Sequence, residues 1–290
     1  MFSLFRDIRD PRLNRRIKVT LVILWVLFLA GLALGGDYGS LPARHWNPSQ
    51  LAKIKVAQPD TLTFAVLGDS RNSREVFERL LEQINHDRDI AFAIHLGDLV
   101  QDGQLPQYRF FIEQVRKNLK KPLLTVIGNH EVKNKGRQLY HDIFGPYYYS
   151  FQVKNNYFIV VDDASKTSLN EAQLGWLAEE LKKAQAFPRR FVFLHIPLFD
   201  PREGEEYRGV PEESRRRLKE LFQQYQVTHI FAAHIHGYYA GKWAGVPYTI
   251  TGGAGAKITG TDPQHYFFHY LKVSIKGDKV RVEVQRLSGP

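Results

Sequence analysis

Five short, largely apolar runs recur between residues 61 and 236, and a polar residue follows each of them within two positions. They are rich in β-branched and aromatic side chains and short enough to be buried strands: TFAVL, IAFAIHL, LLTVI, RFVFL and HIFAA. Helical patterns lie between most of them. This alternation predicts an α/β fold in which helices pack against largely buried sheets.

The segments between the runs indicate where the helices lie. A helix is expected from Ser73, with Asn72 and Glu75 spaced as a capping box. Further helices are expected over Gln107–Leu119, over Glu171–Ala186 and after Pro211. The stretch YYYSFQVKNNYFIVVDD is typical of a hairpin, and the chain from Tyr238 onward is typical of successive antiparallel strands.

The polar residues after the runs form an ordered set. In open α/β sheets, ligands bind beyond the carboxyl ends of the strands, so these side chains are expected to meet at one edge. The set consists of Asp69, Asp98, Asn129, His130, Glu131, His195, His234 and His236. Carboxylate, amide and imidazole ligands suit Mn, Fe, Zn or Mg. Glycines before Asp69, Asp98 and Asn129 would let the backbone turn sharply into the site.

Taken singly, these residues have simpler explanations. An aspartate after a strand is commonly a helix cap, and one histidine is commonly a hydrogen-bonded core imidazole. His234 and His236 would also point to opposite faces of a regular strand, so both can be ligands only if the strand has ended before them. The occurrence of the whole set in order favours a metal site.

The spacing of these motifs resembles that of the calcineurin-like metallophosphoesterases over Thr61 to about Tyr270. The pieces FGPYYYSF, QLGWLAEEL and VPYTITGGAG are similar to the purple-acid-phosphatase-related and cyclic-nucleotide-phosphodiesterase-related branches. The resemblance implies a metallophosphoesterase-type β-sandwich flanked by helices. It also implies a metal-dependent phosphoric ester hydrolase that cleaves a phosphate monoester, diester or anhydride with a metal-activated water.

The same resemblance implies a role for each residue. Two divalent ions of the Mn, Fe, Zn or Mg class would share Asp98 as a bridging ligand. The remaining ligands would be Asn129, His195 and His234 for one ion, and Asp69 and His236 for the other. His130 would act near the leaving group as a proton donor, and Glu131 could orient its ring.

Two positions depart from the family pattern. Many members have Asp-x-His at the first motif, whereas this chain has Asp69-Ser70-Arg71. Arginine has no lone pair to offer a metal, so one nitrogen ligand is lost. The guanidinium of Arg71 would either bind a substrate phosphate or pair with a surface carboxylate. Ala233 replaces the glycine of Gly-His-x-His, which is a small change.

The N-terminal region predicts a membrane anchor. Residues 19–36 form an uncharged run of 18 residues, close to the ~20 that a spanning helix needs, and a basic tail, residues 1–18, precedes it. The positive-inside rule then gives a single-pass cell-membrane protein with a cytoplasmic N-terminus. A linker, residues 37–60, and an extracytoplasmic catalytic domain, residues 61–290, would follow. A cleaved signal peptide is the alternative.

Composition narrows the partners. The formal net charge is +10, of which the first 18 residues supply +4, and no nucleic-acid recognition motif is present. Such a charge fits a phosphorylated small molecule or lipid, an anionic membrane surface or nucleic acid equally, and the lack of a recognition motif makes nucleic acid the less favoured partner. The chain has no cysteine and therefore no disulfide or thiolate ligand. Two other functions stay open: a metal-poor binding or sensor domain of the same fold, and a nuclease-type member of the superfamily.

Overall fold

The computed structural model describes residues 40–56, 61–202 and 207–287. The chain divides into two compact units, residues 1–41 and 42–290, and nearly all of the described residues belong to the second. The expected basic tail, residues 1–18, and the expected anchor, residues 19–36, lie outside the described residues. Within the described ranges, no helix has both the length and the apolar character needed to cross a membrane.

One sheet has five strands in the order β11-β10-β1-β2-β3. Its strands are β1 (Thr61–Leu67), β2 (Ile90–His95), β3 (Leu123–Thr125), β10 (His269–Lys276) and β11 (Lys279–Arg286). The first three run parallel, and β10 pairs antiparallel with β1. The predicted runs TFAVL, IAFAIHL and LLTVI are therefore neighbouring strands whose carboxyl ends meet at one edge.

The other sheet has six strands in the order β4-β5-β6-β7-β9-β8. Its strands are β4 (Tyr149–Val153), β5 (Asn156–Val160), β6 (Arg189–Phe193), β7 (His229–Ala232), β8 (Tyr238–Trp243) and β9 (Val246–Thr251). The four central strands are parallel, and the edge strands β4 and β8 pair antiparallel with them. The predicted hairpin is β4–β5. The expectation of successive antiparallel strands after Tyr238 is confirmed by the pairs β8–β9 and β10–β11, and β9 also pairs parallel with β7.

The two sheets pack face to face through an aromatic core. Phe64 of β1 lies at its centre, with ring centroids 5.4–6.4 Å from those of five phenylalanines. These are Phe92, Phe158, Phe191, Phe193 and Phe231, which come from both sheets and are all fully buried. Burying one such side chain contributes roughly 1.5–3 kcal/mol, so this layer is a major source of stability.

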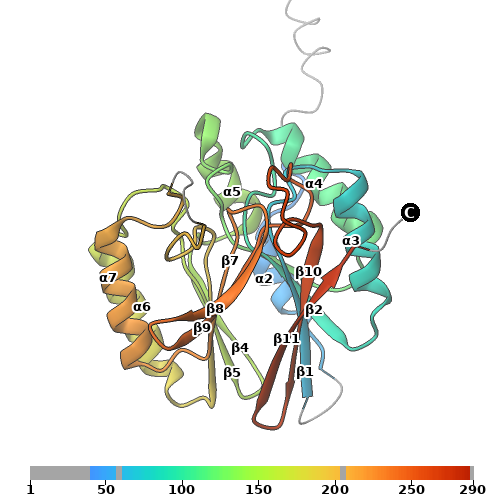
Figure 1. The fold of residues 1–290 in the computed structure, drawn as a ribbon. Helices are drawn as coiled ribbons and strands as arrows, with labels where there is room; N and C mark the ends of the chain where they lie inside the picture. Colours follow the sequence, from blue (N-terminus) through green and yellow to red (C-terminus); the bar gives the residue numbers. More distant parts are fainter. Residues whose placement is uncertain (1–39, 57–60, 203–206, 288–290) are drawn as a thin grey trace, which may run out of the picture. The chain divides into compact units, whose positions relative to one another are not determined.

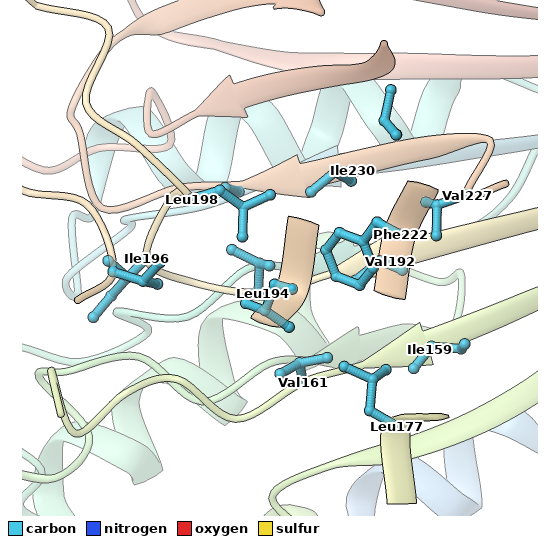
Figure 2. Close-up of a cluster of buried hydrophobic side chains, with 14 of the residues drawn as sticks. Ile159, Val161, Leu177, Val192, Leu194, Ile196, Leu198, Phe222, Val227 and Ile230 are labelled. Atoms are coloured by element: carbon cyan, nitrogen blue, oxygen red, sulfur yellow. The ribbon is translucent and has the colours of Figure 1, made fainter. Parts of the chain in front are cut away.

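Helices cover the outer faces of both sheets (Figure 1). Helices α3 (Glu75–His86) and α4 (Leu105–Asn118) lie on the side of β1 and β2, and α6 (Glu171–Ala184) and α7 (Glu212–Gln224) lie on the side of the six-stranded sheet. Figure 2 shows Leu177 of α6 and Phe222 of α7 among the aliphatic residues of β5, β6 and β7. The predicted α/β architecture, two mixed sheets flanked by helices, is confirmed.

The predicted capping box before α3 is wrong. The helix begins at Glu75, and Arg74 occupies the cap position without a side-chain hydrogen bond. Asn72 has a left-handed backbone with φ +58°. Its side chain instead donates to the Gln107 carbonyl and accepts from the Gln101 amide. The polar residue that looks like a cap therefore ties the loop after β1 to the loop after β2.

Two helices were not anticipated. Helix α2 (Trp46–Leu51) lies in the expected linker, residues 37–60, and packs against β3. Trp46 Nε1 donates to the Leu123 carbonyl, and Asn47 exchanges hydrogen bonds with the backbone of Thr125. Helix α5 (Gly136–Phe144) follows a short 3-10 helix, η2 (Lys133–Lys135). The compact unit thus extends upstream of Thr61, to Pro42.

Candidate metal centre

The loops that follow the parallel strands of both sheets meet in one buried site. Loops after β1, β2 and β3 carry Asp69, Asp98 and Asn129, and loops after β6 and β7 carry the three histidines. Contacts between the sheets hold these loops together. The His234 amide donates to Asp69 Oδ2 at 2.8 Å, and His195 Nε2 lies 3.3 Å from Asp98 Oδ1. The prediction that the side chains after these strands meet at one edge is therefore confirmed.

The side chains form two groups that share one carboxylate. Asp98, His195 and His234 make up the first, and Asp69, Asp98 and His236 make up the second. Within each group the candidate ligand atoms all lie within 4.8 Å of one another. Both groups have the composition and spacing of a site for a divalent cation, and Asp98 lies between them.

In the first group, several electron pairs converge on one point. His195 Nδ1 lies 2.8 Å from the Leu96 carbonyl and so must donate to it, which leaves a lone pair on Nε2. That lone pair faces Asn129 Oδ1 at 3.0 Å, His234 Nδ1 at 3.2 Å and Asp98 Oδ1 at 3.3 Å. A cation at this point would be bound by all four atoms, so the residues fit a metal ion.

In the second group, two buried atoms lack partners. His236 Nδ1 lies 2.8 Å from the Lys257 carbonyl and donates to it, so Nε2 carries the lone pair. His236 Nε2 and Asp69 Oδ1 are both buried without a hydrogen bond, and 3.7 Å separates them. Buried polar atoms are rarely left unpaired, and a cation between these two would satisfy both.

Burial shapes the ionisation of the site. It raises the pKa of Asp69 to about 7, helped by the nearby Asp98 charge. For Asp98, burial acts in the same direction, but His195, His130 and Arg71 outweigh it and hold the pKa below the usual value. Burial also lowers the pKa of His234 to about 2 and of His236 to about 4. Both rings are therefore neutral at pH 7, the form that binds a metal.

The backbone turns differently from the expectation. Asp69 and Asp98 themselves have left-handed backbones, with φ +62° and +53°, whereas only Gly97 of the three preceding glycines has a positive φ. Gly68 is needed for space instead, because a Cβ there would lie 2.5 Å from the Ala233 Cβ. The Ala233 methyl thus occupies room that Gly68 leaves free.

His234 and His236 could both be ligands only if the strand before them ended first, and it does. Strand β7 ends at Ala232, before either of them, and His234 has a left-handed backbone with φ +66°. The chain has therefore left the strand where the two side chains diverge. This geometry lets His234 join one group and His236 the other.

Arg71 has a partner that neither alternative anticipated. Its Nη2 and Nε lie 2.9 and 3.2 Å from Asp98 Oδ2. Asp98 is fully buried, so the partner is the shared carboxylate of the two groups rather than a surface residue. The guanidinium therefore supplies positive charge at the edge of the second group, where the family pattern has a histidine.

Glu131 does not orient the His130 ring as expected. Its carboxylate accepts from the backbone amides of Asp98 at 2.8 Å, Gly128 at 2.7 Å and Val100 at 3.1 Å. The His130 ring instead contacts the Gln101 carbonyl through Nδ1 at 2.5 Å. Glu131 thus holds together the two loops that carry Asp98 and Asn129.

Asp163 was not among the residues predicted from the sequence, and its carboxylate binds backbone amides in the other sheet as that of Glu131 does in the first. It accepts from the backbone amides of His195 at 3.0 Å and Ile196 at 2.9 Å. Burial raises the pKa of its carboxyl well above the usual value. Asp163 lies three residues after the end of β5, as the second aspartate of VVDD, and this position near a strand end was the signal in the sequence.

A cavity of about 610 Å³ opens onto this centre, and its lining includes Arg71, Asn129, His130, His234 and His236. All nine predicted site residues are linked by the contacts described above together with the His130 amide, which donates to Asp98 Oδ1 at 2.9 Å. Two groups of candidate cation ligands at the junction of two mixed sheets are typical of one class of protein, the dinuclear metallohydrolases of α/β-sandwich fold.

Within that class, the chain belongs to the calcineurin-like phosphoesterase family, whose match covers residues 62–238. This family depends on two metal ions, and its members are metal-dependent phosphoric ester hydrolases. The match confirms the resemblance and the enzyme class that the sequence predicts.

Curated relatives lie in the same family. A probable cyclic nucleotide phosphodiesterase of Rhodopseudomonas palustris is 26% identical over 76% of this chain and 90% of its own length. The serine/threonine-protein phosphatase CPPED1 of Bos taurus is 29% identical over 49% of each chain. The match thus spans about half the length of the bovine relative.

Solved structures share the fold. The Plasmodium protein GAP50, an anchor in the inner membrane complex, superposes with a TM-score of 0.62 at 17% identity over 79% of this chain and 85% of that one. The purple acid phosphatase PPD1 of yellow lupin (Lupinus luteus) gives the same TM-score at 16% identity over 79% of this chain and 52% of that one.

Proposed function

We propose that this chain is a membrane-anchored phosphoesterase that hydrolyses a phosphate monoester, diester or anhydride at two metal ions sharing Asp98. The observation that carries the proposal is the pair of unpartnered buried atoms, Asp69 Oδ1 and His236 Nε2, beside a second group whose lone pairs converge. Such an arrangement costs stability unless a cation completes it.

The metal ions would lower the pKa of a bound water and compensate the charge of the phosphate. The chain's own residues would hold the ions and supply a proton to the leaving group. Asp98, Asn129, His195 and His234 would hold one ion, and Asp69, Asp98 and His236 would hold the other. The His130 ring lines the cavity and its Nδ1 contacts the Gln101 carbonyl, so Nε2 is the ring atom that would give a proton to the leaving group, from the imidazolium form of the ring.

Arg71 would bind the phosphate of the substrate. Its guanidinium lines the cavity and lies beside the shared carboxylate. When the metal ions take over the charge of Asp98, the fork of N–H donors becomes available for phosphate oxygens. The relatives named as phosphatases and as a cyclic nucleotide phosphodiesterase support both monoesters and diesters as substrates.

The test is metal reconstitution of the full-length chain. Protein freed of metal with a chelator should hydrolyse p-nitrophenyl phosphate or its bis-ester only after Mn, Zn, Fe or Mg is restored. Asp98→Asn and His195→Ala should lose this activity and bind fewer ions per chain by elemental analysis. Activity that survives both substitutions at the wild-type rate would refute the dinuclear proposal.

The contact between Arg71 and Asp98 favours a second candidate, a metal-poor sensor domain. A guanidinium 2.9 Å from the shared carboxylate already compensates one negative charge in the second group. The same elemental analysis separates the two functions. A chain that binds one ion or none at saturating metal and hydrolyses no ester would be such a sensor.

We also propose that the catalytic domain lies outside the cytoplasm, on the basis of the apolar run over residues 19–36 and the basic residues before it. Protease added to intact cells should then digest the domain. Protection of the C-terminus in intact cells, with digestion after lysis, would reverse the proposed orientation.

A further inference from the structure

The rim of the cavity is strongly basic. Four of its lining side chains are cationic: Arg71, Lys166, Arg208 and Lys257. No carboxylate is found among the described residues that line the cavity. Within the described part of the chain, Lys166, Arg208 and Lys257 are exposed and have no ion-pair partner. This concentration of positive charge exceeds what a single phosphate needs, because the metal ions and Arg71 would already face that group.

Lys166, Lys257 and Arg208 come from separate loops, and a backbone hydrogen bond holds each loop in place. Lys166 belongs to a turn closed by its own amide on the Asp163 carbonyl. Lys257 lies in the loop after β9, and its carbonyl is the acceptor for His236. The Arg208 amide donates to Asp200 Oδ2 at 3.0 Å. The fold therefore brings cationic side chains from separate loops to one cavity.

An aromatic side chain lines the same cavity as these cations. Among the described residues, Tyr207 is the one large hydrophobic side chain that is exposed, at 49%, and it lines the same cavity. Its hydroxyl donates to the Val210 carbonyl at 3.2 Å, and its ring covers Gly209, where a Cβ would lie 2.4 Å from the hydroxyl oxygen. The ring is thus held in place at the entrance.

We propose that the substrate carries a second phosphate directly after the one that is removed, so that the preferred substrate is an organic diphosphate. This inference rests on the proposed function. The terminal phosphoryl group would lie at the metal centre, the inner phosphate on Lys166, Arg208 and Lys257, and the organic group against Tyr207. The cavity volume lies in the ~300–1,000 Å³ range of small-molecule sites.

The reaction balances with water alone. A water oxygen attacks the terminal phosphorus, and the bond from that phosphorus to the bridging oxygen breaks. The bridging oxygen keeps the electron pair and leaves with the organic monophosphate. The proton of the water is released to solvent or to that product. The products are inorganic phosphate and the organic monophosphate.

The experiment compares substrates that share an organic group and differ by one phosphate. Metal-loaded full-length protein is given adenosine diphosphate against adenosine monophosphate, and geranyl diphosphate against geranyl monophosphate. We expect kcat/KM to favour the diphosphate in at least one pair. Lys166→Gln or Lys257→Gln should reduce that preference about 10-fold. Lys219→Gln, an exposed lysine on α7 away from the cavity, is the matched control and should keep it.

The adenosine pair and the geranyl pair distinguish a nucleotide diphosphate from a lipid diphosphate as the substrate. A preference confined to the nucleotide pair, reduced by Tyr207→Leu, assigns the organic group as a flat ring. A preference confined to the geranyl pair and unaffected by Tyr207→Leu assigns it as a lipid chain. Equal kcat/KM for the monophosphate and diphosphate in both pairs overturns the proposal, while hydrolysis of p-nitrophenyl phosphate in the same preparation keeps the proposed function intact.

A binding measurement tests the second-phosphate subsite without relying on catalytic turnover. Calorimetry should find that pyrophosphate binds the metal-loaded chain more tightly than phosphate does, and that Lys166→Gln weakens pyrophosphate binding more than phosphate binding. Elemental analysis before and after titration accounts for chelation, which would affect wild type and Lys219→Gln equally. Equal weakening of both ligands, or none, would overturn the second-phosphate subsite.

Discussion

At the scale of single residues, Arg71 shows how one side chain can serve two states of the site. In the structure its guanidinium contacts the buried Asp98 carboxylate at 2.9 Å. We expect Arg71→Ala to raise the Michaelis constant for p-nitrophenyl phosphate about 10-fold and to weaken inhibition by inorganic phosphate, because a charge-assisted contact is worth ~1.5–3 kcal/mol. Steady-state kinetics measure both effects.

The metal content of the same variant is the control for this prediction. Arg71→Ala should bind as many ions per chain as wild type, and Arg71→His should bind them more tightly because it adds a lone pair beside Asp69 and His236. Loss of metal from Arg71→Ala would mean that the arginine holds Asp98 in position for its ions rather than binding the substrate.

Glu131 carries the second prediction at this scale. Burial and the Asp98 charge raise its pKa to about 8, against the three amide donors that lower it. Glu131→Gln keeps the size of the side chain but turns an NH₂ group toward backbone donors. We expect the free energy of unfolding to fall by roughly 1–3 kcal/mol in urea titrations, with a matching loss of metal affinity. Glu113→Gln on the exposed face of α4 should change neither.

At the scale of elements, buried histidines at strand ends link stability to pH. His229 opens β7, and its Nε2 lies 2.9 Å from the Thr249 hydroxyl. Burial lowers its pKa to about 4, below the ordinary value of 6.5. Between pH 6.5 and 4, His229 is therefore protonated in the unfolded chain and neutral in the folded chain. The folded state keeps its full stability above pH 6.5 and becomes less stable as the solution is acidified.

Replacing His229 should make the unfolding free energy less dependent on pH. Urea midpoints of His229→Gln, taken between pH 4 and 6.5, should show a slope of unfolding free energy against pH smaller by up to about 1.4 kcal/mol per pH unit. His86→Gln, which changes an exposed histidine of α3, should leave the slope unaltered. An unchanged slope in His229→Gln would mean that the ring is not protonated on unfolding.

The elements also show what sequence patterns can and cannot predict. The strands and the helices α4, α6 and α7 could be predicted because periodic burial determines them locally. Helix α2 could not, since six residues carry too little pattern and its stability comes from Trp46 and Asn47 contacting a strand more than 70 positions away. The contact between Arg71 and Asp98 and the bonds of Asp163 are likewise long-range. The set of ligands was accessible because each one follows a recognisable strand.

At the scale of the whole molecule, the metal centre joins the two sheets. One sheet supplies Asp69, Asp98 and Asn129, and the other supplies His195, His234 and His236. Metal should therefore stabilise the domain as a unit. With free metal at 1,000 times the dissociation constant, the free energy of unfolding should rise by about 4 kcal/mol over the chelated protein. Calorimetric melting with and without chelator measures this difference.

Asp98→Asn should lose most of the metal-dependent stabilisation, because the shared ligand contacts both groups. Asp278→Asn, at the fully exposed tip of the β10–β11 hairpin, is the control with the same chemical change and should keep it. Stabilisation by metal that is equal in both variants would place the ion-binding site elsewhere in the chain.

The left-handed backbones at Asp69, Asp98 and His234 have a consequence for laboratory evolution. Glycine adopts this conformation without strain, whereas a side chain costs up to roughly 1–2 kcal/mol, less for aspartate and asparagine than for most residues. A library selected only for heat resistance in metal-free medium should therefore accumulate glycine at these three positions. The survivors would be robust proteins that have discarded their catalyst, and alternating rounds of selection for hydrolysis would be needed to recover the original residues.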